Sequence, residues 1–323
     1  MSASHERVWV EAHARLHFGV LDLAGSRGRR FGGIGAPAPV PPLLVSASAA
    51  PSGVVCEGND AARGTAFAQR FLTYHGVTAG ARLQVHRSLP SHAGLGSGTQ
   101  LALSIARALA EVYDLDTSVE SLATSVGRTR RSGVGMWVFA GGGFVLEGGR
   151  GANTPVAPLL ARIAFPEEWR CVVAVSEGGT MSGAAEESAF DQLPAPPAGE
   201  AERVAHHVLM ALLPALVEAD LTAFGCALAE IQQITGQWFA PAQGGTFSAA
   251  SRELIEELRH LGAHGVGQSS WGPTVYGIVS GDDQAGAVVE GLRAQVGPDV
   301  TLFAGPFPTG GTRVWREPSA AAE

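Results

Sequence analysis

Lysine is absent from this 323-residue chain, and all 22 of its basic residues are arginine. Codon bias alone accounts for such an absence, but the chemical consequences hold whatever the cause. Without lysine there can be no Walker phosphate loop, and no Schiff base can form with a substrate or with pyridoxal phosphate. Any anionic ligand must be held by arginine, histidine, backbone N–H groups or a metal.

Cysteines and long apolar runs are also scarce. The three cysteines, Cys56, Cys171 and Cys226, are widely separated and odd in number. This favours free thiols in a reducing cytoplasm over a disulfide framework or a metal cluster. No stretch approaches the roughly 18 consecutive apolar residues of a membrane span, and the first residues lack the apolar core of a signal peptide. We therefore expect a cytoplasmic protein that is neither exported nor inserted into a membrane.

Negative charge predominates. The chain has 30 acidic residues against 22 basic ones, which gives a formal net charge of −8 and argues against a nucleic-acid-binding surface. Hydrophobic residues make up 46% and charged residues 16% of the chain. This composition and length are typical of a soluble enzyme with two domains, each large enough for its own core.

The order of apolar patterns predicts an α+β protein with two domains, 1–160 and 161–323, because proline punctuates residues 154–168. Strands are expected in each half of "RVWVEAHARLHFGVLDL" and in "PPLLVSASA", "ARLQVHRSLP", "RCVVAVS", "TVYGIVS" and "TLFAG". Helices are expected over residues 60–75, 99–113, 183–190, 202–219, 221–237, 248–261 and 283–296, with a short one ending near 126. We interpret residues 25–37 as a glycine- and arginine-rich loop, and "GMWVFAGGGFVLEGGRG" as a β-hairpin.

The stretch "SHAGLGSGTQLALSIARALAE", residues 91–111, joins a glycine-rich turn to a long helix. Gly94, Gly96 and Gly98 allow backbone shapes that a β-carbon would forbid, so N–H groups can approach a ligand closely. The helix directs its positive end at the same place, and Ser97 and Thr99 add hydroxyl donors. We interpret this turn as a phosphate site. A strand-to-helix corner without a ligand is the alternative.

Residues 90–97, "PSHAGLGS", resemble the phosphate loop of the GHMP superfamily, named after galactokinase, homoserine kinase, mevalonate kinase and phosphomevalonate kinase. "ARLHFGVLDLAG" and "GVGQSSWGPTVYGIV" resemble its other two motifs. In the kinases a second serine of the loop helps to hold magnesium, and a Ser-Gly-x-Asp stretch supplies the catalytic aspartate. Gly98 and Gly135 stand at those positions here. The resemblance therefore implies that phosphate is held and not transferred.

A narrower resemblance covers residues 13–280. The motifs "RLHFGVLDL", "GRRFGGIG", "HAGLGSGTQLAL", "GRTRRSGVG", "GGGFVLEGG" and "GQSSWGPTVYG" are similar to those of the β-ribofuranosylaminobenzene 5'-phosphate synthase family. That family implies a GHMP-kinase-like fold. It has an N-terminal domain like that of a small-subunit ribosomal protein and a ferredoxin-like C-terminal domain. Its enzymes join phosphoribosyl pyrophosphate (PRPP) to an aromatic carboxylate through a C–C bond, releasing CO2 and pyrophosphate.

The resemblance and the residue inventory together suggest site residues. We predict a catalytic role for His17, Asp22 and Arg131. Phosphates of PRPP are expected at Arg15, Arg29, Arg30, Gly94, Leu95, Gly96, Ser97, Gly98, Thr99, Arg128 and Ser132, with Arg27 and Arg130 as further candidates. The acceptor is expected at Gln268, Ser269, Ser270, Trp271 and Thr274, where Trp271 can stack on an aromatic ring.

The sequence also leads to expectations about the acceptor, the metal and the oligomeric state. Mg2+ is expected to accompany the pyrophosphate, without an organic cofactor, and the protein ligands of any metal stay open. The ending "FAGPFPTGGTRVW" differs from that of the methanopterin branch. This favours a pyrazole carboxylate of C-nucleoside antibiotic biosynthesis over 4-aminobenzoate or 4-hydroxybenzoate. The chain could form a homodimer.

Several residues have a plain structural alternative. Asp22 could cap a turn, His17 could be a satisfied structural histidine, and the arginines of residues 128–131 could be a solvated helix end. Residues 268–274 could form an ordinary turn, and Trp238 and Phe239 could belong to the core or to an interdomain cleft. The functional alternatives are an ATP-dependent GHMP kinase and a non-catalytic binding protein that kept the cleft.

Overall fold

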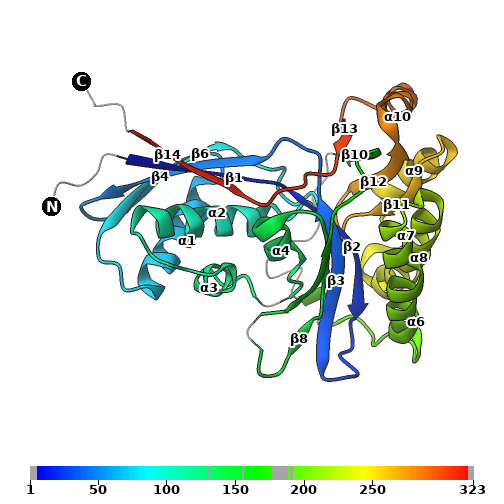
Figure 1. Cartoon of the computed structure of the whole chain (residues 1–323), viewed down its shortest axis with the longest axis horizontal. Coiled ribbons are helices and arrows are strands. Elements are labelled where there is room, and N and C mark those ends of the chain that lie inside the picture. Colours follow the sequence, from blue (N-terminus) through cyan, green and yellow to red (C-terminus); the bar gives the residue numbers. More distant parts are fainter. Residues whose placement is uncertain (1–5, 130, 155, 177–187, 190–191, 319–323) are drawn as a thin grey trace.

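The computed structural model describes residues 6–129, 131–154, 156–176, 188–189 and 192–318. It contains three antiparallel or mixed sheets, each flanked by helices (Figure 1). In the described part of the chain, no helix is both long and apolar enough to cross a membrane. The predicted α+β class is confirmed. The predicted helix over residues 183–190 lies almost wholly outside the described residues.

The first sheet has the strand order β14–β1–β4–β6–β5. Its strands are β1 (Glu6–Ala12), β4 (Leu43–Ala50), β5 (Val54–Gly58), β6 (Gly80–Arg87) and β14 (Arg313–Pro318). One face is covered by α1 (Ala61–Tyr74) and α2 (Ser97–Val112), with α3 (Val119–Ser125) beyond them (Figure 1). Helix α2 forms here because all of its apolar residues from Leu101 to Ala110 are buried, whereas Arg107 in the same run is only partly buried.

The second sheet, β2–β3–β7–β9, stands in the middle of the molecule. It consists of β2 (Arg15–Asp22), β3 (Arg29–Pro37), β7 (Phe144–Glu147) and β9 (Leu159–Ile163), and the short β8 (Arg150–Gly151) also pairs with β3. The prediction of a loop over residues 25–37 was therefore wrong from Arg29 onward. Glycines allow close packing in this strand, since a β-carbon on Gly35 would lie 2.3 Å from the carbonyl oxygen of Leu16.

Helix α4 (Val134–Gly141) replaces the first strand of the hairpin that we predicted. Val134 and Val138 lie one helical turn apart and pack together with Val145 of β7. Five of the eight residues are buried, so the run carries no polar face from which its period could be read. Only the second half of the predicted hairpin is extended, in β7 and β8.

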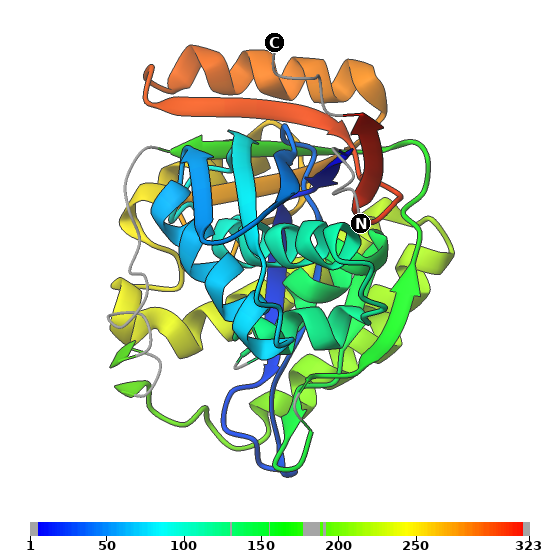
Figure 2. The same ribbon diagram turned by 90° about the vertical axis from the view of Figure 1, so that its left-hand side faces the viewer.

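The third sheet, β11–β12–β10–β13, carries the other helices. Its strands are β10 (Trp169–Ser176), β11 (His264–Gln268), β12 (Thr274–Ser280) and β13 (Val300–Pro306). Around it lie α6 (Glu200–His207), the π-helix η1 (Val208–Leu212), α7 (Leu213–Val217), α8 (Leu221–Gln243), α9 (Ala249–His260) and α10 (Gly281–Gln295). Strands β12 and β13 flank β10 and are joined by α10, as the predicted βαβ-like ending requires (Figure 2).

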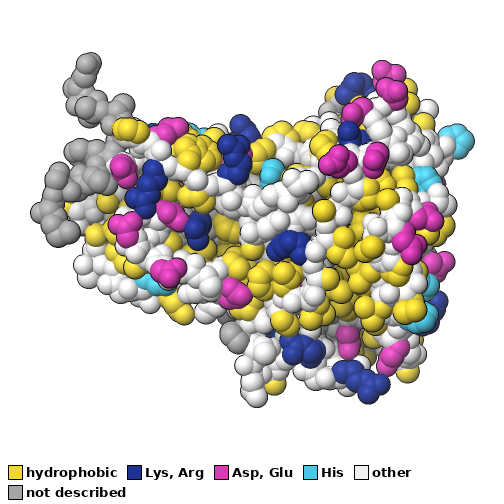
Figure 3. Space-filling view, viewed as in Figure 1, with side chains coloured by type: hydrophobic (Ala, Val, Ile, Leu, Met, Phe, Trp, Pro, Cys, Tyr) yellow, Lys and Arg dark blue, Asp and Glu magenta, His cyan; other side chains and the backbone are white. Residues whose placement is uncertain are grey.

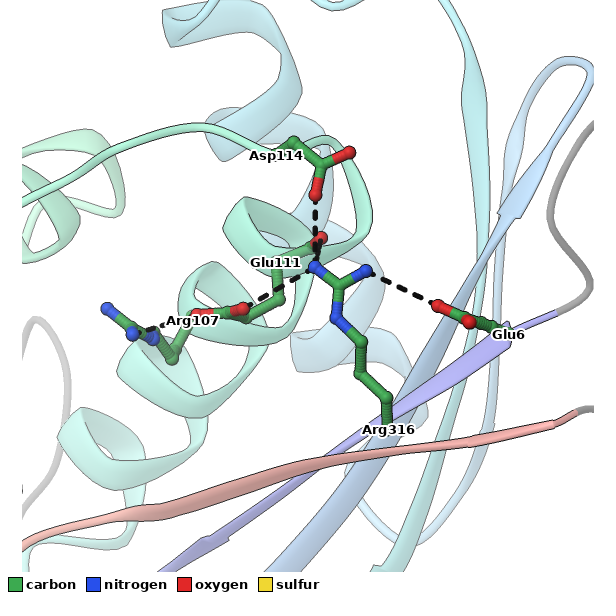
Figure 4. A network of polar contacts seen from close by, with 5 residues as sticks. All are labelled: Glu6, Arg107, Glu111, Asp114 and Arg316. Atoms are coloured by element: carbon green, nitrogen blue, oxygen red, sulfur yellow. Dashed lines mark hydrogen bonds and ion pairs between the residues drawn. The ribbon is translucent and has the colours of Figure 1, made fainter. Parts of the chain in front are cut away.

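The parts of the chain before and after residue 160 are connected in two ways. Phe18 of β2 lies 4.9 Å from Tyr276 of β12 and 6.4 Å from Phe144 of β7, measured between ring centroids, so one core runs through both halves. Strand β14 returns to pair with β1. There Arg316 contacts Glu6, Glu111 and Asp114 (Figure 4). The domain boundary at residue 160 stays a prediction. Strand β14 comes from the predicted second domain but belongs to the sheet of the first.

Charged side chains are dispersed on the face of the molecule shown in Figure 3. Basic and acidic groups lie scattered among hydrophobic ones there, without a continuous basic surface. The arginines that concern function lie in a cavity instead.

Candidate active site

A cavity of about 550 Å³ lies where β2, the glycine-rich turn, α8 and the turn after β11 meet. Ten of the predicted catalytic and phosphate-binding residues line it, and they come from positions 15 to 132 of the sequence. They are Arg15, His17, Gly94, Gly96, Ser97, Gly98, Thr99, Arg128, Arg131 and Ser132. Three residues of the predicted acceptor group, Gln268, Ser270 and Trp271, line it as well.

The glycine-rich turn has the backbone that its sequence suggests. Gly94 and Gly96 have φ values of 80° and 75°, in the region that favours glycine, and Gly96 directly precedes α2. Arg15 of β2 donates from its side chain to the carbonyl oxygen of Gly94 and from its backbone to that of Leu95. These bonds hold the turn against β2. Leu95 itself is buried and contributes only backbone.

The turn also packs directly on the loop that follows β11. A β-carbon on Gly94 would lie 2.3 Å from the carbonyl oxygen of Ser269. A β-carbon on Gly272 would lie 2.2 Å from that of Ala93. The Ser269 hydroxyl donates to the Gly94 carbonyl at 2.7 Å and accepts from the backbone N–H of His17 at 3.0 Å. Ser269 therefore joins the three motifs structurally and does not line the cavity, and neither does the buried Thr274.

Two arginines flank the first turn of α2. A β-carbon on Gly98 would lie 3.1 Å from Nη2 of Arg128 and 3.7 Å from Nη1 of Arg63. Arg63 is held there by an ion pair with Asp60, 2.7 Å from Nη2 to Oδ2, and by a hydrogen bond from Nη2 to the Ser91 hydroxyl. The two guanidinium groups and the N-terminus of α2 make this part of the cavity chemically suited to an anion.

Lining residues in the described part of the chain include no aspartate and no glutamate. Four arginines line the cavity: Arg15, Arg63, Arg128 and Arg131. No group of three or more His, Cys, Asp or Glu side chains among the described residues could hold a metal ion. The cavity is therefore suited to phosphate groups and does not fit a metal held by protein ligands.

Three predicted residues lie elsewhere for clear physical reasons. Asp22 accepts hydrogen bonds from the backbone N–H groups of Gly25 at 2.7 Å and Ser26 at 3.0 Å, so it caps the turn, which was the alternative. Arg29 donates to the carbonyl oxygens of Gly148 and Gly149, and Arg30 to that of Leu23. None of the three lines the cavity. Arg27 is exposed on the same turn, and Arg130 lies outside the described residues.

His17 of β2 lines the cavity and is almost fully buried. The register of β2 against β3 shifts between His17 and Gly19, and Gln232 of α8 donates to the Phe18 carbonyl there. Burial, with a smaller contribution from the charge of Arg15, lowers the pKa of His17 from its ordinary 6.5 to about 3. Its imidazole is therefore neutral at physiological pH. Its Nε2 lies 3.1 Å from the hydroxyl oxygen of Ser132.

Aromatic side chains also line the cavity. Phe239 of α8 and Trp271 have ring centroids 5.1 Å apart at an angle of 52°, and Phe247 is a further lining residue. Trp238, the neighbour of Phe239, is instead 3% exposed and donates to Glu200 Oε2 at 2.6 Å. The two alternatives for Trp238 and Phe239 are thus divided, with Trp238 in the core and Phe239 in the cavity.

Several lining residues were not predicted from the sequence: Phe31, Arg63, His92, Gln232, Thr235, Gln243, Thr246 and Phe247. Most lie on α8 or in the segment that follows it. Their helical pattern gives a burial face but no sign that the polar members of that face meet a cavity. Arg63 lies 35 positions before Gly98, which it approaches, and no local pattern joins the two.

Family models and related proteins of known name indicate the same family for this chain. GHMP kinase N-terminal and C-terminal domains match residues 61–141 and 212–298. The β-ribofuranosylphenol 5'-phosphate synthase of Methanothermobacter thermautotrophicus is 32% identical over 92% of this chain and 95% of that protein. The synthase of the same name from Archaeoglobus fulgidus is 34% identical, over 87% and 90%.

Among solved structures, a homoserine kinase from Cytophaga hutchinsonii superimposes with a TM-score of 0.71 over 96% of this chain and 97% of that one. Its 16% sequence identity shows a shared fold alone. The two synthases, by contrast, match at 32% and 34% identity over nearly their whole lengths. The chain is therefore an enzyme of the β-ribofuranosylphenol 5'-phosphate synthase family, built on the GHMP kinase fold.

Proposed function

We propose that this enzyme transfers the phosphoribosyl group of PRPP to the ring carbon of an aromatic carboxylate, forming a C–C bond. The observation that carries the proposal is the cavity itself. It is lined by four arginines and the first turn of α2, and no carboxylate lines it within the described residues. The names of the two synthases, whose product is a ribosylated phenol phosphate, support the same reaction.

The bonds of this reaction balance without an added base. The bond from the anomeric carbon of PRPP to the pyrophosphate oxygen breaks, and its electron pair leaves with pyrophosphate. The ring carbon that bears the carboxylate then bonds to the anomeric carbon. The bond to the carboxyl carbon breaks last, so that CO2 departs and its electron pair restores aromaticity. The enzyme's contribution is to position the reactants, stabilise the leaving group and exclude water.

Two kinds of lining group suit the two reactants. Arg63, Arg128 and the start of α2 lie together and offer charge-assisted hydrogen bonds to a leaving pyrophosphate. Phe239 and Trp271 also line the cavity and offer aromatic faces to an acceptor ring. Neutral amide groups of Gln232, Gln243 and Gln268 line the same region.

For the acceptor, we now favour a phenolic acid such as 4-hydroxybenzoate over a pyrazole carboxylate. The preference for a pyrazole came from the distinctive ending of the chain. That segment packs on the end of α4, where Thr312 donates from its backbone to the Phe139 carbonyl at 2.9 Å. No described residue after Gly272 lines the cavity, so the ending does not bear on the acceptor directly.

We propose that Mg2+ enters with PRPP as part of the substrate. The residues present do not fit a protein-held ion, because arginines surround the phosphate site and no carboxylate lines it in the described part of the chain. The same feature opposes the kinase alternative. A kinase of this fold would need a catalytic carboxylate, and Gly135 stands where that residue is expected.

Carboxyl-labelled acceptor tests the reaction directly. The purified enzyme is incubated with PRPP, Mg2+ and either 4-hydroxybenzoate or an aminopyrazole carboxylate, and the products are analysed by mass spectrometry. We expect a ribosylated product without the label, together with one CO2 and one pyrophosphate per turnover. Label retained in the product would mean attachment through oxygen or nitrogen. Consumption of ATP in a parallel reaction with candidate alcohols would instead support a kinase.

A further inference from the structure

Glu147 is a fully buried carboxylate next to the cavity. It is the last residue of β7 and is 0% exposed. Its Oε1 accepts from the backbone N–H of Gly133 and from the Ser132 hydroxyl, each at 3.1 Å, and its Oε2 accepts from the backbone N–H of Gly149 at 2.7 Å. Every one of these partners donates to it. Burying a carboxylate costs free energy even when hydrogen bonds satisfy its oxygens, so its presence here calls for a function.

The Ser132 hydroxyl links this carboxylate to the cavity. It has one hydrogen, and it donates that hydrogen to Oε1 of Glu147. Burial raises the pKa of the Glu147 carboxyl group, whereas the hydrogen bonds from its three donors lower it. The Ser132 oxygen also accepts from the backbone N–H of Val134 at 3.2 Å. Its remaining neighbour, Nε2 of His17 at 3.1 Å, must then be a donor. The carboxylate of Glu147, at one end of this series of hydrogen bonds, therefore sets the direction of each bond.

Gly33 of β3 makes this arrangement possible. It pairs with Glu147 in the sheet, and β3 lies between β2, which carries His17, and β7. A β-carbon on Gly33 would lie 3.2 Å from both Nε2 of His17 and Oγ of Ser132. A side chain at this position would crowd both groups.

We propose that Glu147, acting through Ser132, is a positioning residue that fixes the hydrogen of the His17 imidazole on Nε2 and leaves Nδ1 as a bare acceptor for a bound ligand. No described residue donates a hydrogen bond to Nδ1, and His17 lines the cavity. The ligand group is a hydroxyl or amino donor. It can come from a ribose hydroxyl of PRPP or from the ring substituent of the acceptor. This second step rests on the proposed function, whereas the tautomer does not.

Nitrogen NMR of the histidine-labelled enzyme tests the tautomer without any substrate. The His17 signals are assigned by their loss in His17→Gln. We expect the neutral form with hydrogen on Nε2 in the native enzyme, a mixture of tautomers in Ser132→Ala, and restoration in Ser132→Thr. Ser125→Ala is the control, because Ser125 is a buried serine that donates to the Leu122 carbonyl away from the cavity. Hydrogen on Nδ1 in the native enzyme, or an unchanged tautomer in Ser132→Ala, would overturn the proposal.

Two binding measurements distinguish the sources of the donor. If a ribose hydroxyl is the partner, Ser132→Ala weakens PRPP binding by roughly 2- to 10-fold, the range for one neutral hydrogen bond. If the acceptor substituent is the partner, Ser132→Ala raises the KM for 4-hydroxybenzoate by a similar factor. It then leaves that for 4-methoxybenzoate unchanged. A lost tautomer preference without either effect would overturn the role of His17 in ligand binding. It would not count against the proposed synthase reaction.

Glu147→Gln provides the second variant. The amide has one acceptor oxygen in place of two, so it cannot accept from all three donors. We expect the same mixture of tautomers as in Ser132→Ala if the variant folds. Should it fail to fold, the serine variants decide the question alone, since they keep the carboxylate and its two backbone hydrogen bonds.

Discussion

Gly98 and Arg128 lie so close that a β-carbon at position 98 would be 3.1 Å from Nη2 of Arg128. The GHMP kinases are expected to carry a magnesium-holding serine at this position. Here the absence of a side chain lets a guanidinium group lie against the first turn of α2. An arginine thus takes a place that the kinase motif gives to a hydroxyl group and its metal.

Gly98→Ala should separate stability from binding. Gly98 has no left-handed backbone and lies in α2, where alanine favours the helix by about 1 kcal/mol. Its β-carbon would nevertheless crowd Arg128. We expect an unchanged or raised free energy of unfolding and a PRPP affinity lowered several-fold, measured by calorimetry. Gly286→Ala in α10, where nothing lies within 4 Å, is the matched control and should leave affinity alone. Equal PRPP affinity in both variants would contradict the phosphate site.

Arg128→Ala should weaken PRPP binding by roughly 10- to 150-fold, the range for a hydrogen bond to a charged group. The comparison is Arg203→Ala, which removes an exposed arginine of α6 that does not line the cavity. Initial rates over a range of PRPP concentrations measure the effect. A change of less than about twofold for Arg128→Ala would mean that the arginine contributes nothing to phosphate binding.

Phe239 and Trp238 are neighbours with opposite expected roles. Phe239→Leu should raise the KM for the aromatic acceptor by roughly 3- to 10-fold, since aromatic pairs contribute about 0.5–1.5 kcal/mol beyond burial. It should leave the free energy of unfolding nearly unchanged. Trp238→Leu should do the reverse, because it opens a cavity in the core and removes the partner of Glu200. Steady-state kinetics and urea denaturation of both variants check this division.

The buried neutral His17 should make the protein sensitive to acid. Its pKa of about 3 in the fold lies below its ordinary 6.5, so between these values the unfolded chain binds a proton that the folded one does not. Stability from this group is therefore complete above pH 6.5 and is lost as the pH falls, by about 1.4 kcal/mol per pH unit.

Urea denaturation of the native enzyme and of His17→Gln at several values between pH 7 and pH 5 measures this loss. We expect a shallower pH dependence in the variant, by about 2 kcal/mol over the range. His260→Gln, at an exposed position of α9, should keep the native dependence. Parallel curves for native enzyme and His17→Gln would mean that the imidazole is charged in the fold.

The sequence alone was enough for the elements whose local pattern is unambiguous. The glycine-rich turn and α2 could be predicted, because Gly94, Gly96 and the apolar run from Leu101 determine backbone shape and burial within a few residues. The buried strand β10 and the long helix α8 followed from apolar patterns in the same way.

Only the tertiary structure decided which polar groups share the cavity. Arg29 and Arg30 looked as suitable as Arg128, yet Arg29 binds the carbonyl oxygens of Gly148 and Gly149, and Arg30 binds that of Leu23. The unpredicted Arg63 instead reaches α2. Glu147 reaches Ser132 and His17 only because β2, β3 and β7 are paired in register. Side-chain type and local period are properties of the chain. Whether a guanidinium or a carboxylate meets a ligand or a backbone oxygen depends on contacts between residues that are 15 to more than 200 positions apart.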